Sequence, residues 1–170
     1  MRSVTVNTDA SFSKITGHGS YAFWIVCDGF RIKRSGVFKE KPRNPHEAEA
    51  RAILNAMHVL LKFLPGIEVV YLNTDSLNCI HVFNKDKKNI QRYRLRYLFP
   101  YRDKLEKIKK ENNQAGVRID FRHVKSHTGI DDKRSYVNEW CDTNAKARLK
   151  EFLLKEGLWI DFKKHNDNGK

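Results

Sequence analysis

Along the first part of the chain, hydrophobic and polar positions alternate with the two-residue period of half-buried β-strands. This alternation predicts strands over residues 3–8, 20–27 and 30–38. Asp28-Gly29 lies between the last two and indicates a hairpin, because a tight turn needs a residue that accepts positive φ. We therefore expect three antiparallel strands at the start of the chain.

The pattern then changes to the 3.6-residue period of a helix over residues 48–64. Asn44 can cap this helix, and Pro45 suits its first position. Glu47 stands where the carboxylate of a capping box would reach back to the cap. Pro65-Gly66 provides the stop signal, so local chemistry defines both ends of the helix.

The rest of the chain alternates between strand and helix. The predicted elements are a strand over 67–72, a short helix over 77–83, a helix over 101–112, a strand over 117–124, a loop over 126–135 and a helix over 137–156 that Gly157 closes. Hairpins followed by βαβ units predict an α/β domain with a mixed five-stranded sheet flanked by helices. We expect a single domain over residues 1–160 and a polar tail over 161–170.

The net charge of the chain indicates a polyanionic binding partner. The chain has 33 Lys and Arg residues against 20 Asp and Glu residues, for a formal net charge of +13. A domain this basic repels itself, so nucleic acid is the first partner to consider. The alternative is a basic protein whose charge only keeps it in solution.

Cysteine usage and the N-terminal sequence favour the cytoplasm. Cys27, Cys79 and Cys141 include no CxxC pair and no Cys/His cluster, which argues against a disulfide scaffold and a zinc site. The N-terminus has no long apolar run that predicts a signal peptide, and no other segment predicts a membrane span. We therefore expect a cytoplasmic protein with no membrane partner.

Two aspartates follow predicted strands, where α/β sheets bind their ligands. Asp9 comes after the first strand, and Asp75 comes after the strand that ends near Leu72. If these strands are neighbours, the two carboxylates meet at one edge of the sheet. The alternative for each is an ordinary turn or helix-cap residue.

Two further carboxylates lie on helices that must pack against the sheet. Glu49 shares the apolar face of its helix, where an ionised carboxylate is costly unless it is paired or bound to a metal. Its alternative role is a first-turn residue that the helix dipole favours. Asp142 lies beside the apolar stripe of the last helix. Four converging carboxylates suit Mg²⁺ or Mn²⁺ and the two-metal hydrolysis of a phosphodiester.

The segments around these carboxylates resemble the type I ribonuclease H family over residues 3–150. The matching segments are Asn7-Thr8-Asp9-Ala10-Ser11, Gly17-His18-Gly19-Ser20-Tyr21-Ala22, Ala48-Glu49-Ala50-Arg51-Ala52, Asn73-Thr74-Asp75-Ser76, Val124-Lys125-Ser126-His127-Thr128-Gly129 and Asn138-Glu139-Trp140-Cys141-Asp142. The resemblance implies a ribonuclease H fold and an endoribonuclease that cuts the RNA strand of RNA–DNA hybrids. The products would carry 5′-phosphate and 3′-hydroxyl ends.

The resemblance also implies roles for individual residues. The metal-binding quartet, for two Mg²⁺ ions that Mn²⁺ can replace, would be Asp9, Glu49, Asp75 and Asp142. His127 is similar to a loop histidine that assists proton transfer or product departure. Contacts with the hybrid backbone would come from Ser11, Asn44 and Ser76. No small-molecule cofactor is implied, and we expect a monomer.

A basic segment in the middle of the chain is a further candidate for substrate binding. Arg92, Arg94 and Arg96 alternate with Tyr and Leu, and such a stretch can contact phosphates without reading sequence. The family resemblance suggests the same use. The alternative is an ordinary solvated surface.

Two other classes of function fit parts of the sequence. An integrase- or transposase-like strand-transfer enzyme shares the fold, but it typically uses three carboxylates and brings additional DNA-binding domains. A non-catalytic nucleic-acid-binding module is the second alternative. The fourth carboxylate and the His127 motif favour the nuclease over both.

Overall fold

The computed structural model describes residues 2–124 and 133–159, with side chains of the second range described from residue 136 onward. A five-stranded sheet in the order β3-β2-β1-β4-β5 forms its centre. The strands are β1 (Ser3–Phe12), β2 (Gly19–Cys27), β3 (Phe30–Val37), β4 (Val69–Thr74) and β5 (Arg118–His123). The first three strands pair antiparallel, and β4 and β5 continue the sheet in parallel with β1. This arrangement confirms the predicted mixed sheet.

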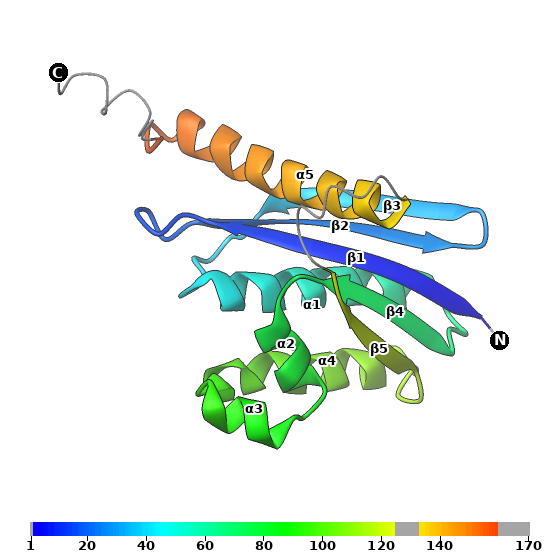
Figure 1. Ribbon diagram of the computed structural model, residues 1–170. Helices are drawn as coiled ribbons and strands as arrows, with labels where there is room; N and C mark the ends of the chain where they lie inside the picture. Colours follow the sequence, from blue (N-terminus) through cyan, green and yellow to red (C-terminus); the bar gives the residue numbers. More distant parts are fainter. Residues whose placement is uncertain (1, 125–132, 160–170) are drawn as a thin grey trace, which may run out of the picture.

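Helices cover both faces of the sheet (Figure 1). They are α1 (Pro45–Phe63), α2 (Leu77–Phe83), α3 (Lys87–Arg92), the 3₁₀ helix η1 (Leu95–Leu98), α4 (Phe99–Glu111) and α5 (Lys133–Lys155). The helix α1 packs against β1, β2 and α4 on one face, whereas α5 packs against β1, β2 and β3 on the other. None of the helices in the described ranges has the length and apolar composition that a transmembrane span requires.

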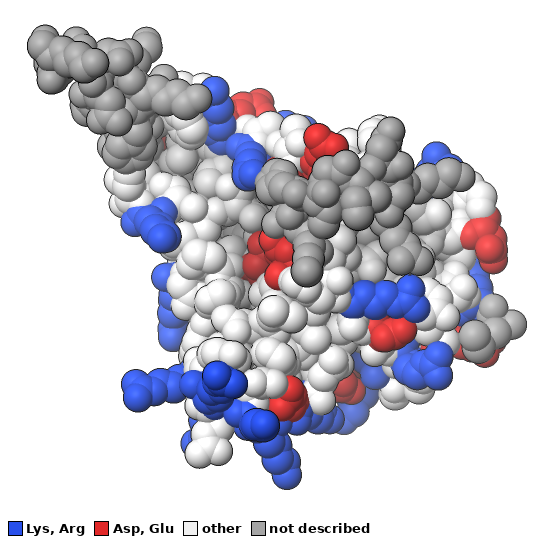
Figure 2. Space-filling view, in the orientation of Figure 1, with Lys and Arg blue, Asp and Glu red and all other residues white. Residues whose placement is uncertain are grey.

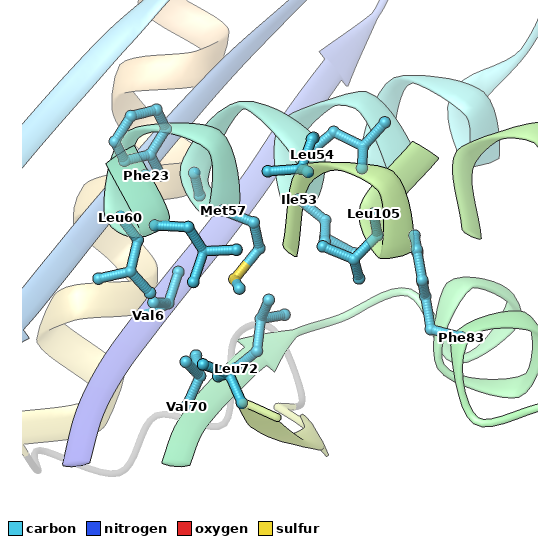
Figure 3. Close-up of a cluster of buried hydrophobic side chains, with 14 of the residues drawn as sticks. Val6, Phe23, Ile53, Leu54, Met57, Leu60, Val70, Leu72, Phe83 and Leu105 are labelled. Atoms are coloured by element: carbon cyan, nitrogen blue, oxygen red, sulfur yellow. The ribbon is translucent and has the colours of Figure 1, made fainter. Parts of the chain in front are cut away.

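The main hydrophobic core lies between the sheet and α1 (Figure 3). Val6 of β1 and Leu72 of β4 are fully buried against Ile53, Met57 and Leu60 of α1. A smaller cluster on the opposite face joins β2 to α5 and consists of Ala22, Trp24, Cys141 and Ala145. Because both faces are packed, the positions of α1 and α5 relative to the ends of β1 and β4 are fixed.

Several element boundaries differ from the sequence prediction. The strand β1 does not end at residue 8, because Asp9–Phe12 continue to pair with Gly19–Ala22 of β2. The segment after Lys85 contains α3 and η1, which the sequence pattern does not predict. The helix α5 begins at Lys133, inside the expected loop. By contrast, the predicted helix over residues 77–83 and the hairpin at Gly29, with φ of 75°, are both confirmed.

Candidate active site

The register of β1 and β4 brings Asp9 and Asp75 together. These parallel strands pair up to Asn7 and Asn73, whose side chains are joined by a 2.9 Å hydrogen bond from Nδ2 of Asn73 to Oδ1 of Asn7. Each aspartate lies two residues beyond its asparagine. Since side chains alternate along a strand, each aspartate is carried on the same side as its asparagine. Both carboxylates therefore reach the same edge of the sheet.

Glu49 enters this edge from the second turn of α1. The N–H of Ala10 donates to Oδ1 of Asp9 at 2.8 Å and to Oε1 of Glu49 at 3.1 Å. One carboxylate oxygen from each of Asp9, Glu49 and Asp75 lies within 4.8 Å of the others. The structure thus brings together three of the four predicted carboxylates in a group that could hold a cation.

Burial and mutual repulsion make full ionisation of this group unfavourable. Burial, together with the charges of Asp75 and Asp142, raises the pKa of Asp9 to about 7. Burial and the charge of Asp9 raise the pKa of Glu49 well above its usual value. Burial also raises the pKa of Asp75, against the opposing charge of His123. Without a cation between them, the carboxyl group of Asp9 would hold a proton over part of the neutral pH range.

Asp142 faces the same centre from α5 but lies outside the group of three. Its Oδ2 is 2.7 Å from Nζ of Lys146. Its charge nevertheless contributes to the raised pKa of both Asp9 and Asp75. Asp142 therefore belongs to the electrostatic environment of the centre, and its predicted role as a fourth metal ligand stays a prediction.

The chemistry of these side chains fits a hard divalent cation. Glu49 is only 9% exposed, and its Oε2 accepts no hydrogen bond from any N–H or O–H of the described residues. A buried carboxylate oxygen without a donor is costly unless a cation takes the donor's place. All the ligand atoms offered are carboxylate oxygens, which Mg²⁺ and Mn²⁺ prefer over the nitrogen and sulfur ligands of zinc sites.

The other predicted site residues have different surroundings. Ser11 is half-buried in β1. Asn44 caps α1, since its Oδ1 accepts from the N–H of Glu47 at 2.9 Å, and Ser76 caps α2, since its Oγ accepts from the N–H of Cys79 at 3.3 Å. His127 lies outside the described residues.

Glu47 does not play the capping-box role that the sequence suggests. Its Oε1 is 2.7 Å from Nη2 of Arg51, and the residue is only 4% exposed. Arg51 also donates to the carbonyl oxygen of Glu40 at 2.7 Å and to the hydroxyl of Tyr101 at 3.4 Å. The pair of buried Glu47 with half-buried Arg51 therefore ties α1 to the preceding loop and to α4. The carboxylate of Glu47 pairs with Arg51 and does not reach back to the helix cap.

Two basic residues at the centre were not among the predicted site residues. His123, the last residue of β5, has its Nε2 3.2 Å from the carbonyl oxygen of Asp75, because β5 pairs with β4 up to Thr74. Lys146 lies one helical turn after Asp142, so the helical period of the last helix could have identified it. His123 gives no comparable signal, because its position depends on the pairing of β5.

Arginines of the basic segment lie on the surface at the end of α3 and around η1. Arg92, Arg94 and Arg96 are all exposed, and the guanidinium of Arg92 lies 5.4 Å from the ring centroid of Tyr93. Figure 2 shows Lys and Arg gathered at the lower left, where Figure 1 places α3, and a group of acidic atoms in the middle of the same face. This charge distribution separates a basic surface from an acidic centre.

The sheet order and the acidic centre define an α/β protein of the ribonuclease H type. The family model described as RNase H matches residues 1–150, and the chain belongs to this family. No curated protein matches the chain.

Solved structures agree with the family assignment at the level of the fold. RNase H1 of the archaeon Halobacterium salinarum is 17% identical with a TM-score of 0.59, over 88% of this chain and 98% of that chain. The N-terminal RNase H domain of a Mycobacterium tuberculosis protein is 14% identical with a TM-score of 0.61, over 92% and 99%. LC11-RNase H1, solved in complex with an RNA/DNA hybrid, is 18% identical with a TM-score of 0.58, over 86% and 99%.

Proposed function

We propose that the protein is a ribonuclease H, an endonuclease that hydrolyses the RNA strand of RNA–DNA hybrids and leaves 5′-phosphate and 3′-hydroxyl ends. The observation that carries this proposal is the group formed by Asp9, Glu49 and Asp75, whose ligand oxygens lie within 4.8 Å of one another. Membership of the RNase H family supports it, because the acidic group lies within the matched residues. A structural neighbour in complex with an RNA/DNA hybrid supports the same substrate class.

Four carboxylates would hold two Mg²⁺ ions, with Mn²⁺ as a substitute: those of Asp9, Glu49, Asp75 and Asp142. Ions bound there supply activation of the attacking water and stabilisation of the leaving oxygen. Asp9 and Glu49 are held side by side by the N–H of Ala10, so the protein orients two ligands before any ion binds. His127 would assist proton transfer or product departure.

The hybrid would be held mainly through its phosphates. Arg92, Arg94 and Arg96 are exposed and free to reach a polyanion, and the formal net charge of +13 favours its approach. Ser11 belongs to β1 two residues beyond Asp9, and Asn44 and Ser76 stand at the starts of α1 and α2. These three residues would contact the backbone of the hybrid.

A cleavage assay with a labelled hybrid tests the proposed function directly. We expect the wild-type chain with Mg²⁺ to cut only the RNA strand, and a chelator to stop cleavage. Asp9→Asn and Asp75→Asn should each remove cleavage while leaving the fold intact by circular dichroism. Single-stranded RNA, double-stranded RNA and double-stranded DNA serve as substrate controls.

The same assay separates the alternative functions. A non-catalytic nucleic-acid-binding module would bind the hybrid and leave both strands intact. A strand-transfer enzyme would act on DNA ends and join them to a second duplex. Either result would replace the ribonuclease H proposal.

We also propose a cytoplasmic monomer. Cys27, Cys79 and Cys141 are free and buried in the structure, as expected for a protein of a reducing compartment. Sedimentation of the full chain would determine the oligomeric state.

A further inference from the structure

Lys146 is held at the edge of the acidic centre by the packing of α5. Cys141, which precedes Asp142, is fully buried, and its Sγ lies 3.6 Å from the carbonyl oxygen of Asn7. This contact fixes α5 at Cys141 against β1, two residues before Asp9. Lys146 follows Asp142 by one turn and places its Nζ 2.7 Å from Oδ2 of Asp142. The ammonium is therefore beside the fourth carboxylate of the centre.

The charge of Lys146 reaches a second carboxylate on a different element. Burial raises the pKa of Asp75 at the end of β4, and the positive charges of His123 and Lys146 oppose this rise. An ordinary pair four residues apart on an exposed helix face stabilises only its own partner, and only weakly. Lys146 instead stabilises the charged forms of two carboxylates, Asp142 on α5 and Asp75 after β4. It therefore acts as a counter-ion of the whole centre.

Lys146 also has the freedom to leave this position. Its side chain is 59% exposed, whereas that of Asp142 is 22% exposed. A lysine ammonium on a flexible four-carbon stem can turn into water without disturbing the packing of its helix. The contact with Asp142 can therefore break while the carboxylate stays in place.

We infer that Lys146 is a positioning residue that acts as an internal counter-ion, which a divalent cation must displace from Asp142 in order to bind. The ammonium and the divalent cation compete for the same carboxylate oxygen and repel each other. Lys146 thereby sets the Mg²⁺ concentration that the centre requires. The inference rests on the proposed metal-dependent function, since it assigns to Lys146 a part in loading that metal site.

Binding of Mg²⁺ alone, without substrate, tests this inference. The full chain is titrated with MgCl₂ at constant ionic strength, and binding is measured by calorimetry and by the rise in Tm with Mg²⁺ concentration. Removing one positive charge near the site should tighten Mg²⁺ binding of Lys146→Met by about three- to tenfold. The conservative variant Lys146→Arg keeps the charge and should bind Mg²⁺ as the wild type does.

Lys150→Met provides the matched control, because it removes the same charge from the same helix one turn further on. Lys150 is exposed, and its Nζ lies 5.2 Å from the ring centroid of Trp159 rather than at the acidic centre. This variant should bind Mg²⁺ with the affinity of the wild type. If Lys150→Met tightened binding as much as Lys146→Met, only the general charge of the protein would matter, and the inference would be wrong.

Two other results would also overturn the inference, and they differ from a failure of the proposed function. Equal Mg²⁺ affinity in the wild type and Lys146→Met would show that the ammonium does not compete with the metal. Tighter binding by Lys146→Arg as well would point to the shape of the side chain rather than its charge. If the wild type itself bound no Mg²⁺, the metal-dependent function would fail first, and the inference with it.

Discussion

Asp9 and Glu49 accept hydrogen bonds from one and the same backbone amide, the N–H of Ala10, at 2.8 Å and 3.1 Å. One N–H dipole cannot compensate two carboxylate charges that burial has removed from water. The pKa of Asp9 consequently rises to about 7 through burial and the charges of Asp75 and Asp142. This raised pKa links the stability of the protein to pH.

The first prediction is that Asp9→Asn stabilises the protein in the presence of a chelator, and more at alkaline than at acidic pH. Because the folded-state pKa of Asp9 lies above its unfolded value of 3.8, the folded protein binds more protons between these two values. Stability therefore falls as pH rises through about 7, and the uncharged amide escapes this loss. Thermal unfolding at about pH 5 and about pH 8 measures the difference.

Each kcal/mol that Asp9→Asn adds to the free energy of unfolding should raise Tm by about 2–4 °C in a protein of this size. The control is Asp103→Asn, which removes an exposed carboxylate that lies 3.0 Å from Nη2 of Arg102 on α4. Its effect on Tm should be similar at both pH values. If Asp9→Asn raised Tm equally at both pH values, the pKa of Asp9 would not be raised in the folded protein.

The second prediction contrasts two glutamates that lie two residues apart on α1. Glu49→Gln should remove cleavage, because Glu49 contributes an oxygen to the acidic group. Glu47→Gln should retain most cleavage at temperatures where the protein is folded. It should lower the free energy of unfolding by about 1–3 kcal/mol, since it weakens the interaction of the buried Glu47 side chain with Arg51. Hybrid cleavage and urea unfolding of both variants separate the two roles.

A reversed ranking, with Glu47→Gln inactive and Glu49→Gln active, would mean that Glu47 and not Glu49 is the metal ligand. The matching variant on the other side of the pair is Arg51→Met, which should destabilise the protein as Glu47→Gln does. The double variant should cost less than the sum of the two, because each single change already removes the same interaction between Glu47 and Arg51.

The acidic centre could largely be predicted from the sequence because its geometry follows from local signals. Asp9 and Asp75 each come two residues after an asparagine, and the parallel pairing of Asn7 with Asn73 places them side by side. Glu49 was identified by its position on the apolar face of a helix. Asp142 was identified by its position beside the apolar stripe of the last helix. Each inference needed only strand ends or the helical period.

What the sequence did not predict depends on contacts between distant segments. The carboxylate of Glu47 was assigned to a capping box, because nothing in its local sequence indicates the burial that Tyr101 and Arg51 provide. The extension of β1 to Phe12 requires the pairing partner β2. The helix α3 is short and capped by Asp86, whose Oδ1 accepts from the N–H of Asn89 at 3.2 Å, and it has too few residues to show a helical period.

The last prediction concerns the arginines of the basic segment. Replacing Arg92, Arg94 and Arg96 together with Ala should raise KM for a hybrid, flatten the dependence of KM on salt and leave kcat nearly unchanged. Phosphates that these side chains neutralise release condensed counter-ions, so each lost contact reduces the salt slope by about 0.9 for a duplex with B-DNA charge spacing. Contacts remote from the scissile bond stabilise substrate and transition state equally, and their loss therefore affects KM rather than kcat.

A second triple variant removes the same charge from a different surface. Its substitutions, all at exposed lysines of α4, are Lys104→Ala, Lys107→Ala and Lys110→Ala. Because both variants lower the net charge by the same amount, a purely long-range effect would shift their KM values equally. We expect a clearly larger change in KM and in salt slope for the arginine variant, independent of the base sequence of the hybrid. Coinciding salt slopes in the two variants and the wild type would mean that the hybrid is held elsewhere on the surface, and that the arginines around η1 are ordinary solvated residues.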